Sequence, residues 1–303
     1  MAGRRRKKSG GRSYAWRYRG RIVACVFVEV IIICALVIMI GWNKGVKEWF
    51  EQFEQPVLKE VDISGINSPN AILMQARGGK ILGEINGEAQ IYPASMTKIM
   101  TVILGIENFD NLDEKITLTD EMFAGLYEQD ATQAGFQPGE EVRVIDLLYG
   151  AMLPSGAECC IALADTISGS EADFAELMNK KARKLGMENT HFCDSTGLHN
   201  PDHYSTVKDI AVLMKYCIKN DTFREIVETS RHSTGVTNIH PDGITYYSTM
   251  FKNLSDPTVT GGKILGGKTG YTSEAGHCLV SFAEIAGREY IFVSAGASGA
   301  DGN

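Results

Sequence analysis

Three short segments contain residue types that together can carry out nucleophilic acyl transfer. The first is 93–98 (PASMTK), in which a serine and a lysine stand three residues apart. On a helix this spacing puts both side chains on one face, so the Lys98 amine can approach the Ser95 hydroxyl. Serine needs an adjacent base to become a strong nucleophile, and lysine serves as that base only when its pKa is lowered. Alone, the pair is a weak signal because it also occurs on solvated helices.

The second and third segments are equally ambiguous when each is taken by itself. In 153–158 (LPSGAE), Ser155 can act in catalysis, or it can cap a helix with Glu158 as its capping-box partner. In 267–270 (GKTG), glycines flank Lys268 and Thr269, which allows a ligand to approach the backbone closely. A cation beside a hydroxyl can bind a carboxylate, but an ordinary exposed strand also fits the third segment.

The hydrophobic pattern indicates which elements hold these segments. A hairpin is expected near the start of the folded part, helices in the middle, and short apolar strands near the end. This order predicts a sheet built from both ends of the chain with a helical insertion between them. The expected strands are 71–74, 81–85, 258–259, 262–269, 277–284 and 290–295, and the expected helices follow Pro93 and cover 144–152, 158–166, 171–185 and 207–219.

The N-terminal part has the pattern of a membrane anchor. Residues 1–21 contain nine Lys and Arg and no acidic residue, and residues 22–42 are apolar except for Glu29. As a helix, 21 residues extend roughly 32 Å, enough for a hydrocarbon core of about 30 Å. A cleaved signal peptide has a shorter apolar stretch and a small-residue cleavage site, which 41–43 (GWN) fits poorly.

We therefore predict four parts for the chain. Residues 1–21 form a basic cytoplasmic tail, 22–42 a single transmembrane anchor, 43–59 a juxtamembrane linker, and 60–303 a domain on the outer face of the membrane. The linker has an apolar helical stripe, which either lies on lipid headgroups or packs on the domain. The stripe consists of Val46, Trp49, Phe50 and Phe53.

Composition and charge exclude several classes of protein. The chain is 44% hydrophobic, which excludes whole-chain disorder. Outside the tail, residues 22–303 carry 21 basic and 37 acidic side chains, a net charge of about −16, so a nucleic-acid partner is not expected. No Cys-x-x-Cys pair supports a zinc knuckle or a thioredoxin-like site. Five of the seven cysteines lie outside the predicted anchor, and we expect them mostly to be buried apolar residues: Cys159, Cys160, Cys193, Cys217 and Cys278.

In this order, the three segments match the Ser-x-x-Lys, second-motif serine and Lys-Thr-Gly signature of serine enzymes that recognise penicillin. Over about 60–300 the chain resembles the serine D-alanyl-D-alanine carboxypeptidases, the low-molecular-weight penicillin-binding proteins of peptidase family S11. The second motif is usually Ser-x-Asn in that family, whereas position 157 is alanine here. The longer matching stretches are 92–101, 147–156, 179–206 and 266–282.

The resemblance implies a role for each motif residue. Ser95 is the acylated nucleophile, Lys98 its base, and Ser155 the serine that relays a proton to the leaving amine. Lys268, Thr269, Gly270 and Tyr271 bind the substrate, and the backbone N–H groups of Ser95 and Tyr271 form the oxyanion hole. We also expect repulsion from Lys268 to keep the Lys98 amine partly uncharged.

The resemblance also implies a fold and a reaction. The fold is an α/β (α+β) β-lactamase/transpeptidase-like fold, with a mainly antiparallel sheet flanked by helices plus a helical subdomain. The reaction removes the terminal D-alanine from peptidoglycan stem peptides through an acyl-enzyme, is inhibited by β-lactams, and needs no metal or organic cofactor.

Three other functions compete with this interpretation. Ala157 in place of the usual asparagine is compatible with a membrane-tethered penicillin-binding module that turns over little substrate. Glu176, shortly after the second motif, weakly resembles the deacylating glutamate of a class-A-like β-lactamase. His199 and His203 have the spacing of a zinc-binding helix, but Pro201 lies between them, so packing within a loop is the better interpretation.

Overall fold

The computed structural model describes residues 60–254 and 256–299. The predicted cytoplasmic tail, transmembrane anchor and juxtamembrane linker (1–21, 22–42 and 43–59) lie outside these residues, and these assignments stay predictions. Within the part of the chain that the structure describes, no helix combines the length and apolar character needed to cross a membrane.

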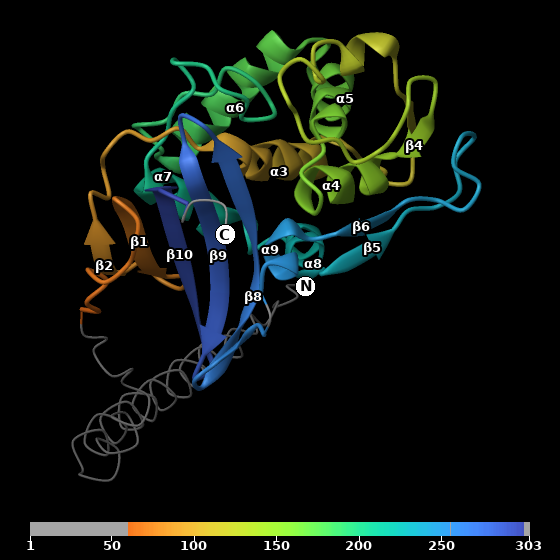
Figure 1. The fold of residues 1–303 in the computed structure, drawn as a ribbon. Helices are drawn as coiled ribbons and strands as arrows, with labels where there is room; N and C mark the ends of the chain where they lie inside the picture. The colour runs from red at the N-terminus through yellow and green to blue at the C-terminus, as the bar shows by residue number, and fades with distance from the viewer. Residues whose placement is uncertain (1–59, 255, 300–303) are drawn as a thin grey trace, which may run out of the picture. The chain divides into compact units, whose positions relative to one another are not determined.

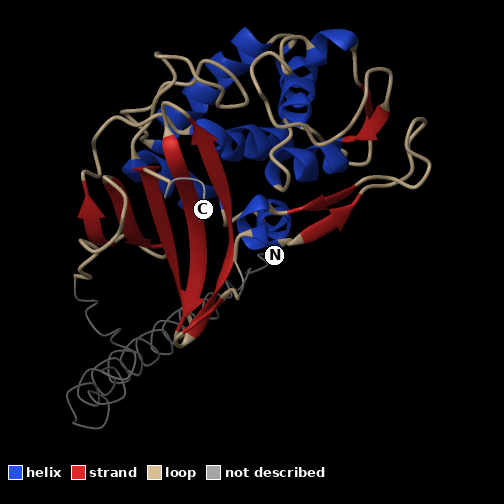
Figure 2. Ribbon diagram, in the orientation of Figure 1, coloured by secondary structure: helices blue, strands red, loops and turns tan. Residues whose placement is uncertain are grey.

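A six-stranded antiparallel sheet contains segments from both ends of the described chain (Figures 1 and 2). β1 pairs with β2 on one side and with β10 on the other, so that Asn70 lies opposite Ala295. The predicted antiparallel sheet with a helical insertion is therefore confirmed. In spatial order the strands are β2 (Ile81–Ile85), β1 (Asn70–Gln75), β10 (Arg288–Ala297), β9 (Gly276–Ile285), β8 (Gly262–Thr272) and β7 (Thr258–Val259).

One face of the sheet forms part of the hydrophobic core. Because side chains alternate along a strand, every second residue of β1, β9 and β10 points to this face. Helix α7 (Val207–Cys217) packs on β1, β9 and β10, and helix α8 (Asp221–Glu228) packs on β8. The buried strand residues include Ile72, Met74, Val280, Phe282, Ile291 and Val293.

The helical part lies beside the sheet, with α3 (Lys98–Asn108) at its centre (Figure 1). Helix α3 is buried along its first two turns and contacts helices on several sides. Its partners are α4 (Val144–Met152), α5 (Ala157–Ser168), α6 (Glu171–Leu185), α7 and α8. The predicted helices at 144–152 and 171–185 have the observed limits, and those at 158–166 and 207–219 differ from the observed ones by one or two residues at an end. The helix predicted directly after Pro93 begins with a 3-10 turn and becomes α-helical only at Lys98.

Several short elements have no counterpart in the predicted pattern. Three-residue strands contain too few residues to show a hydrophobic period, so they are visible only through their pairing. They form the two small sheets β3 (Lys115–Thr117) with β4 (Glu141–Arg143) and β5 (Arg231–Ser233) with β6 (Thr245–Tyr247). The remaining short elements are the 3-10 turns η1 (Ala94–Thr97) and η2 (Asp120–Phe123) and the helix α9 (Thr249–Lys252).

The five cysteines of the described residues are free thiols. Cys193 is partly exposed, whereas Cys159, Cys160, Cys217 and Cys278 are buried among apolar neighbours, as the sequence predicts for most of them.

Candidate active site

The candidate nucleophile stands on a tight turn that leads into α3. Pro93 and Ala94 precede Ser95, and Ala94 has a φ of 47°, a conformation that non-glycine residues seldom adopt. The sequence predicts a helix directly after Pro93. Instead, residues 94–97 form the 3-10 turn η1, and the α-helix begins at Lys98. The tight first turn brings the Ser95 hydroxyl and the Lys98 amine to the same side of the chain.

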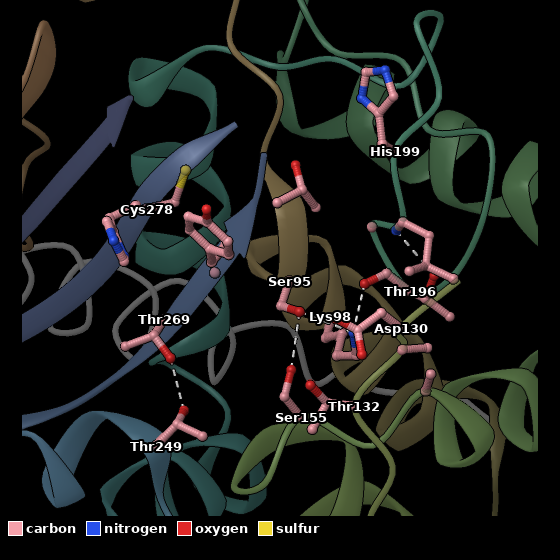
Figure 3. A pocket seen from close by; sticks show the side chains of 18 of the residues that line it. Ser95, Lys98, Asp130, Thr132, Ser155, Thr196, His199, Thr249, Thr269 and Cys278 are labelled. Atoms are coloured by element: carbon pink, nitrogen blue, oxygen red, sulfur yellow. Dashed lines mark hydrogen bonds between the residues drawn. The ribbon is translucent and has the colours of Figure 1, made fainter. Parts of the chain in front are cut away.

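Lys98 is buried, with 4% of its surface exposed, and its amine makes two hydrogen bonds. Nζ donates to Ser95 Oγ at 3.1 Å and to the backbone carbonyl of Thr196 at 2.6 Å (Figure 3). Burial is the main reason that the pKa of Lys98 is lowered from its ordinary value, and nearby groups on α5 and at Asp194 oppose that shift. At a given pH, a larger fraction of the Lys98 amine is therefore neutral, and able to accept a proton from Ser95, than for a solvated lysine.

Ser155 joins the nucleophile from the loop before α5. Its hydroxyl donates to Ser95 Oγ at 3.0 Å, from a backbone with a φ of 75°. The capping-box interpretation is wrong, because α5 is capped at Gly156 without a side-chain hydrogen bond. The Glu158 carboxylate instead accepts from the backbone N–H groups of Ala134 and Gly135, at 2.6 Å and 3.0 Å. Both side chains are thus occupied by tertiary contacts that the local pattern does not reveal.

Lys268 completes the hydrogen-bonded run from the strand side. Its side chain is almost wholly buried, so the alternative of an exposed strand lysine is wrong. Nζ donates to Ser155 Oγ at 3.0 Å and to the Thr269 carbonyl at 2.8 Å. The pKa of Lys268 is lowered well below its ordinary value, first by burial and second by repulsion from Lys98. Burial is thus the largest cause of the lowered pKa of both lysines. The repulsion between the two amines lowers the pKa of Lys268, whereas the expected effect of Lys268 on the pKa of Lys98 is not among the main causes, and the groups that act on Lys98 raise its pKa.

The rest of the third motif forms a wall of the pocket. A Cβ built on Gly270 would lie only 3.0 Å from the backbone N of Ser95, so glycine permits the strand to press against η1. The next residue, Tyr271, also lines the pocket and is 62% exposed. This close packing brings the backbone of Ser95 near the backbone of 270–271. An oxyanion hole needs two N–H donors close together, and the N–H groups of Ser95 and Tyr271 are the expected pair.

Thr269 meets a second hydroxyl that the sequence did not single out. Its Oγ1 lies 2.7 Å from Oγ1 of Thr249, the first residue of α9, and both threonines line the pocket (Figure 3). Thr249 stands twenty residues before Thr269, on an element too short for a periodic pattern. Thr196 was also missed, because it contributes a backbone carbonyl and therefore has no sequence signature.

A cavity of about 940 Å³ opens over these groups. Six of the seven predicted site residues line this cavity, and residues of loops far apart in the sequence complete the lining. The lining includes Ser95, Lys98, Ser155, Thr269, Gly270 and Tyr271, together with Asp130, Thr132, Thr196, His199 and Thr249. The seventh predicted residue, Lys268, reaches this group through Ser155.

The other candidate residues lie elsewhere or have other partners. Glu176 is exposed on α6 and lines a separate hollow, not the Ser95 cavity. His203 is buried against Thr97, whereas His199 packs its ring edge-on against Tyr92. Across residues 60–254 and 256–299, no group of three or more His, Cys, Asp or Glu side chains is arranged to hold a metal ion.

Comparison with known proteins identifies the family. The family model for D-alanyl-D-alanine carboxypeptidase, peptidase family S11, matches residues 57–299. The D-alanyl-D-alanine carboxypeptidase DacF of Bacillus subtilis is 35% identical over 233 residues, which cover 76% of this chain and 57% of DacF. DacC of Escherichia coli is 33% identical over 261 residues, which cover 78% of this chain and 58% of DacC. The chain thus spans less than three fifths of the length of these two relatives.

A solved structure shows the same fold. The DD-transpeptidase of Streptomyces K15 superposes with a TM-score of 0.70 at 30% sequence identity, covering 79% of this chain and 93% of that protein. The fold, the order of the three motifs and the matched span all agree with those of this family. The chain therefore belongs to the D-alanyl-D-alanine carboxypeptidase family, peptidase family S11.

Proposed function

We propose that this chain is a serine-type D-alanyl-D-alanine carboxypeptidase that removes the terminal D-alanine from peptidoglycan stem peptides. The observation that carries the proposal is the continuous hydrogen-bonded run from Lys98 through Ser95 and Ser155 to Lys268, with successive distances of 3.1, 3.0 and 3.0 Å. It places a nucleophile, a base and a proton relay within reach of one another.

In the acylation step, Ser95 Oγ attacks the carbonyl carbon of the penultimate D-alanine while Lys98 accepts the hydroxyl proton. The backbone N–H groups of Ser95 and Tyr271 stabilise the oxyanion that forms. Ser155 then donates a proton to the nitrogen of the terminal D-alanine, and the C–N bond breaks. The proton that Lys98 took from Ser95 passes back to Ser155 by way of Lys268, whose Nζ lies 3.0 Å from Ser155 Oγ. Lys98 is therefore neutral again before the second step. The products are free D-alanine and an ester on Ser95.

In the second step, water attacks the ester carbonyl and gives a proton to Lys98. The bond to Ser95 Oγ breaks, and Lys98 returns this proton to the serine oxygen, which lies 3.1 Å from its amine. The net reaction is hydrolysis of one peptide bond and consumes one water molecule. Because side chains supply the nucleophile, the base and the proton relay, the proposed steps use no metal or organic cofactor. β-Lactams imitate the D-alanyl-D-alanine terminus and would leave Ser95 acylated for longer.

The paired hydroxyls of Thr249 and Thr269 suit the free carboxylate of the substrate. Both threonines line the cavity beside the buried Lys268 amine, and a carboxylate oxygen can accept from both hydroxyls. This arrangement supports cleavage at the end of a peptide rather than within it.

We also propose that the protein is a single-pass membrane protein whose catalytic domain faces outward, anchored by residues 22–42. The length and apolar character of this segment and the nine basic residues before it support this orientation. In that location the partners are the stem peptide, β-lactams and the membrane, and no nucleic acid. Treatment of intact cells with an external protease should degrade the domain but leave residues 1–21 protected.

One observation favours a second candidate function. Position 157, where the family usually has asparagine, is a buried alanine, so a substrate amide lacks one carboxamide partner. A penicillin-binding module with little turnover would fit that loss, which by analogy with an oxyanion-hole donor costs on the order of 10²–10³ in rate. A β-lactamase has less support, because Glu176 lies outside the cavity.

Two measurements separate these functions. A fluorescent penicillin should label the full chain but not the Ser95→Ala variant, and a pentapeptide ending in D-alanyl-D-alanine should release D-alanine. Labelling without release would leave the binding module as the function. Rapid turnover of penicillin would favour the β-lactamase, and the absence of both labelling and release would contradict the enzyme.

A further inference from the structure

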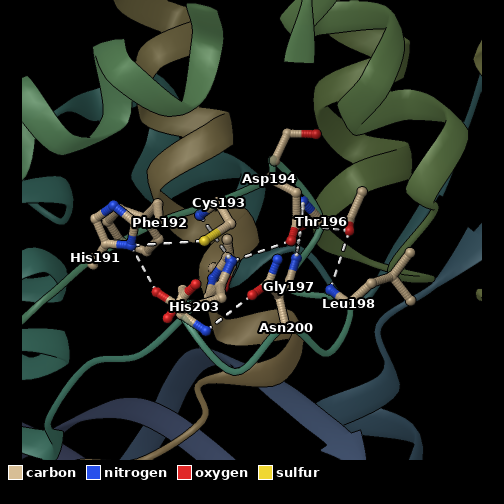
Figure 4. Close-up of polar contacts among 12 residues, drawn as sticks. His191, Phe192, Cys193, Asp194, Thr196, Gly197, Leu198, Asn200 and His203 are labelled. Carbon is tan, nitrogen blue, oxygen red and sulfur yellow. Dashed lines mark hydrogen bonds and ion pairs between the residues drawn. The ribbon is translucent and has the colours of Figure 1, made fainter. Parts of the chain in front are cut away.

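A polar network around Asp194 joins the turn at 194–197 to His203 (Figure 4). It connects to the nucleophile turn from two sides, at Lys98 and at Thr97. It begins at Asp194, in the loop between α6 and α7. One carboxylate oxygen of Asp194 accepts from the Thr196 backbone N–H, the Thr196 hydroxyl and the Gly197 backbone N–H, at 2.8, 2.7 and 2.7 Å. These bonds fix the turn at 194–197, and with it the Thr196 carbonyl that accepts from Lys98 Nζ.

The second oxygen of Asp194 leads to the nucleophile turn by another route. It lies 3.1 Å from Nδ1 of His203, and Nε2 of His203 lies 2.9 Å from the hydroxyl of Thr97. Thr97 directly precedes Lys98 and belongs to the same 3-10 turn as Ser95. His203 and Thr97 are both buried, so the contact is shielded from water.

Backbone packing joins the two routes. Gly197 has a φ of 79°, and a Cβ at this position would lie 1.9 Å from the carbonyl oxygen of Ala94. The 194–197 turn therefore presses on the residue before Ser95, where only glycine fits. Asp194, the turn and the nucleophile helix form a closed ring of contacts around the Lys98 side chain.

We propose that Asp194 and His203 are positioning residues that hold the Thr196 carbonyl and the 95–98 turn at a fixed separation, so that the Lys98 amine stays directed at Ser95. The proposal rests on the proposed function. Neither residue touches the reacting atoms, because both act through Thr196 and Thr97. Asp194 in this chain thus contributes to catalysis although it belongs to none of the three motifs.

The titratable groups around Lys98 make the proposal measurable. Glu158 and the thiols of Cys159 and Cys160 lie near the amine on α5, Asp194 lies near it in the loop, and Lys268 lies beyond Ser155 on β8. Burial raises the pKa of both thiols, so they are uncharged at neutral pH. Although burial opposes the shift, hydrogen bonds from His203 and Thr196 lower the pKa of Asp194 to about 2, so this carboxylate is ionised at neutral pH. Its negative charge raises the pKa of Lys98 against the effect of burial.

The test compares Asp194→Asn and Thr97→Val with Asp202→Asn in the full 303-residue chain. Asp202 is an exposed aspartate of the same loop, so its variant makes the same change of charge away from the network. For each protein, the titration of the Lys98 amine is followed by NMR with ¹⁵N-labelled lysine, and the rate of acylation by fluorescent penicillin is measured against pH.

We expect Asp194→Asn to lower the pKa of Lys98, to move the acidic limb of the acylation profile to lower pH, and to reduce the maximal rate about 10-fold or more. Thr97→Val removes only the link to His203, so the maximal rate should fall while the limb stays in place. Asp202→Asn should change neither quantity.

The proposal is overturned if Lys98 titrates identically in the wild type and Asp194→Asn, or if Asp202→Asn matches the effects of Asp194→Asn. If Asp194→Asn does not fold, a Thr97→Val rate within twofold of the wild type overturns it. If the wild type itself is not acylated at Ser95, the proposed function fails, and the Lys98 titration still decides whether Asp194 and His203 control this amine.

Discussion

The hydroxyl of Ser155 donates to the hydroxyl of Ser95 across 3.0 Å, from a backbone position whose φ of 75° ordinarily favours glycine. Backbone hydrogen bonds of the next two residues hold this conformation, from Gly156 N–H to the Gly150 carbonyl and from Ala157 N–H to the Thr132 carbonyl, each at 2.8 Å. The strained backbone at Ser155 therefore places its hydroxyl between Ser95 and Lys268.

This relationship predicts that stability and activity separate at position 155. Ser155→Gly and Ser155→Ala both remove the hydroxyl, so acylation by penicillin should fall by about 10²–10⁴-fold in each. Glycine relieves the left-handed conformation and alanine does not, so the glycine variant should have the higher free energy of unfolding, by about 1 kcal/mol. Urea denaturation and penicillin labelling measure the two effects, and equal stability of the two variants would argue against strain at this residue.

Gly270→Ala should impair acylation without unfolding the sheet. The added Cβ would approach the backbone N of Ser95, the Cβ of Ala94 and the carbonyl of Pro93, at 3.0, 3.1 and 3.2 Å, and force β8 away from η1. A displacement near 1 Å at a reacting group can cost on the order of 10²-fold in rate. The measurement is the rate constant for acylation by labelled penicillin.

Gly65→Ala is the matched control for Gly270→Ala, because no atom lies within 4 Å of a Cβ built on Gly65. It should retain the wild-type rate. If Gly270→Ala also retained that rate, the close approach of β8 to Ser95 would have no catalytic role.

Lys268→Met should change how stability depends on pH. The pKa of Lys268 is lowered well below its ordinary value of 10.5, chiefly by burial. At pH values between the lowered pKa of the folded state and the ordinary pKa of the unfolded chain, the unfolded chain binds more protons than the folded one. The free energy of unfolding therefore rises with pH across this window. The wild type should therefore gain stability relative to Lys268→Met when the pH is raised from 7 to 10, as measured by urea denaturation.

Lys263→Met supplies the comparison for this pH effect, since Lys263 is exposed on the same strand. Its stability difference from the wild type should be nearly the same at both pH values. A Lys268→Met difference that is also independent of pH would show that the buried amine titrates as it does in the unfolded chain.

Thr249→Val should weaken recognition of the substrate carboxylate. The variant keeps the shape of the side chain and removes the hydroxyl that lies 2.7 Å from the Thr269 hydroxyl. Loss of one hydrogen bond to a charged group should lower kcat/KM for a D-alanyl-D-alanine peptide by about 10-fold. The same peptide with an amidated C-terminus is the control, and an equal loss with both peptides would exclude a specific role in carboxylate binding.

The sequence predicts most of the sheet and the longer helices well, for a physical reason. The strands and helices that match, such as 81–85 and 171–185, are long enough for their apolar residues to repeat with a clear period. The pairs β3–β4 and β5–β6 have three residues per strand and gain their stability from pairing, which no local pattern contains.

Within the site, motif residues were predictable and the groups that orient them were not. Ser95, Lys98, Ser155 and Lys268 lie together because the three motifs converge in space. Thr196 takes part through its carbonyl, which every residue type possesses, so its identity carries no information. The capping-box interpretation of Ser155 and Glu158 was wrong because tertiary partners outcompeted a locally reasonable bond.

The pairing of Asn70 with Ala295 has a consequence for biosynthesis. A ribosome releases β1 more than two hundred residues before the strand that flanks it, and such distant pairing slows folding. β8, which carries Lys268, pairs with β7 and β9, and β9 pairs in turn with β10, so the sheet that holds β8 against η1 is complete only when the last strand has emerged. A nascent chain therefore holds the serine without its second amine, and acylating capacity arises only once translation of the whole domain is complete.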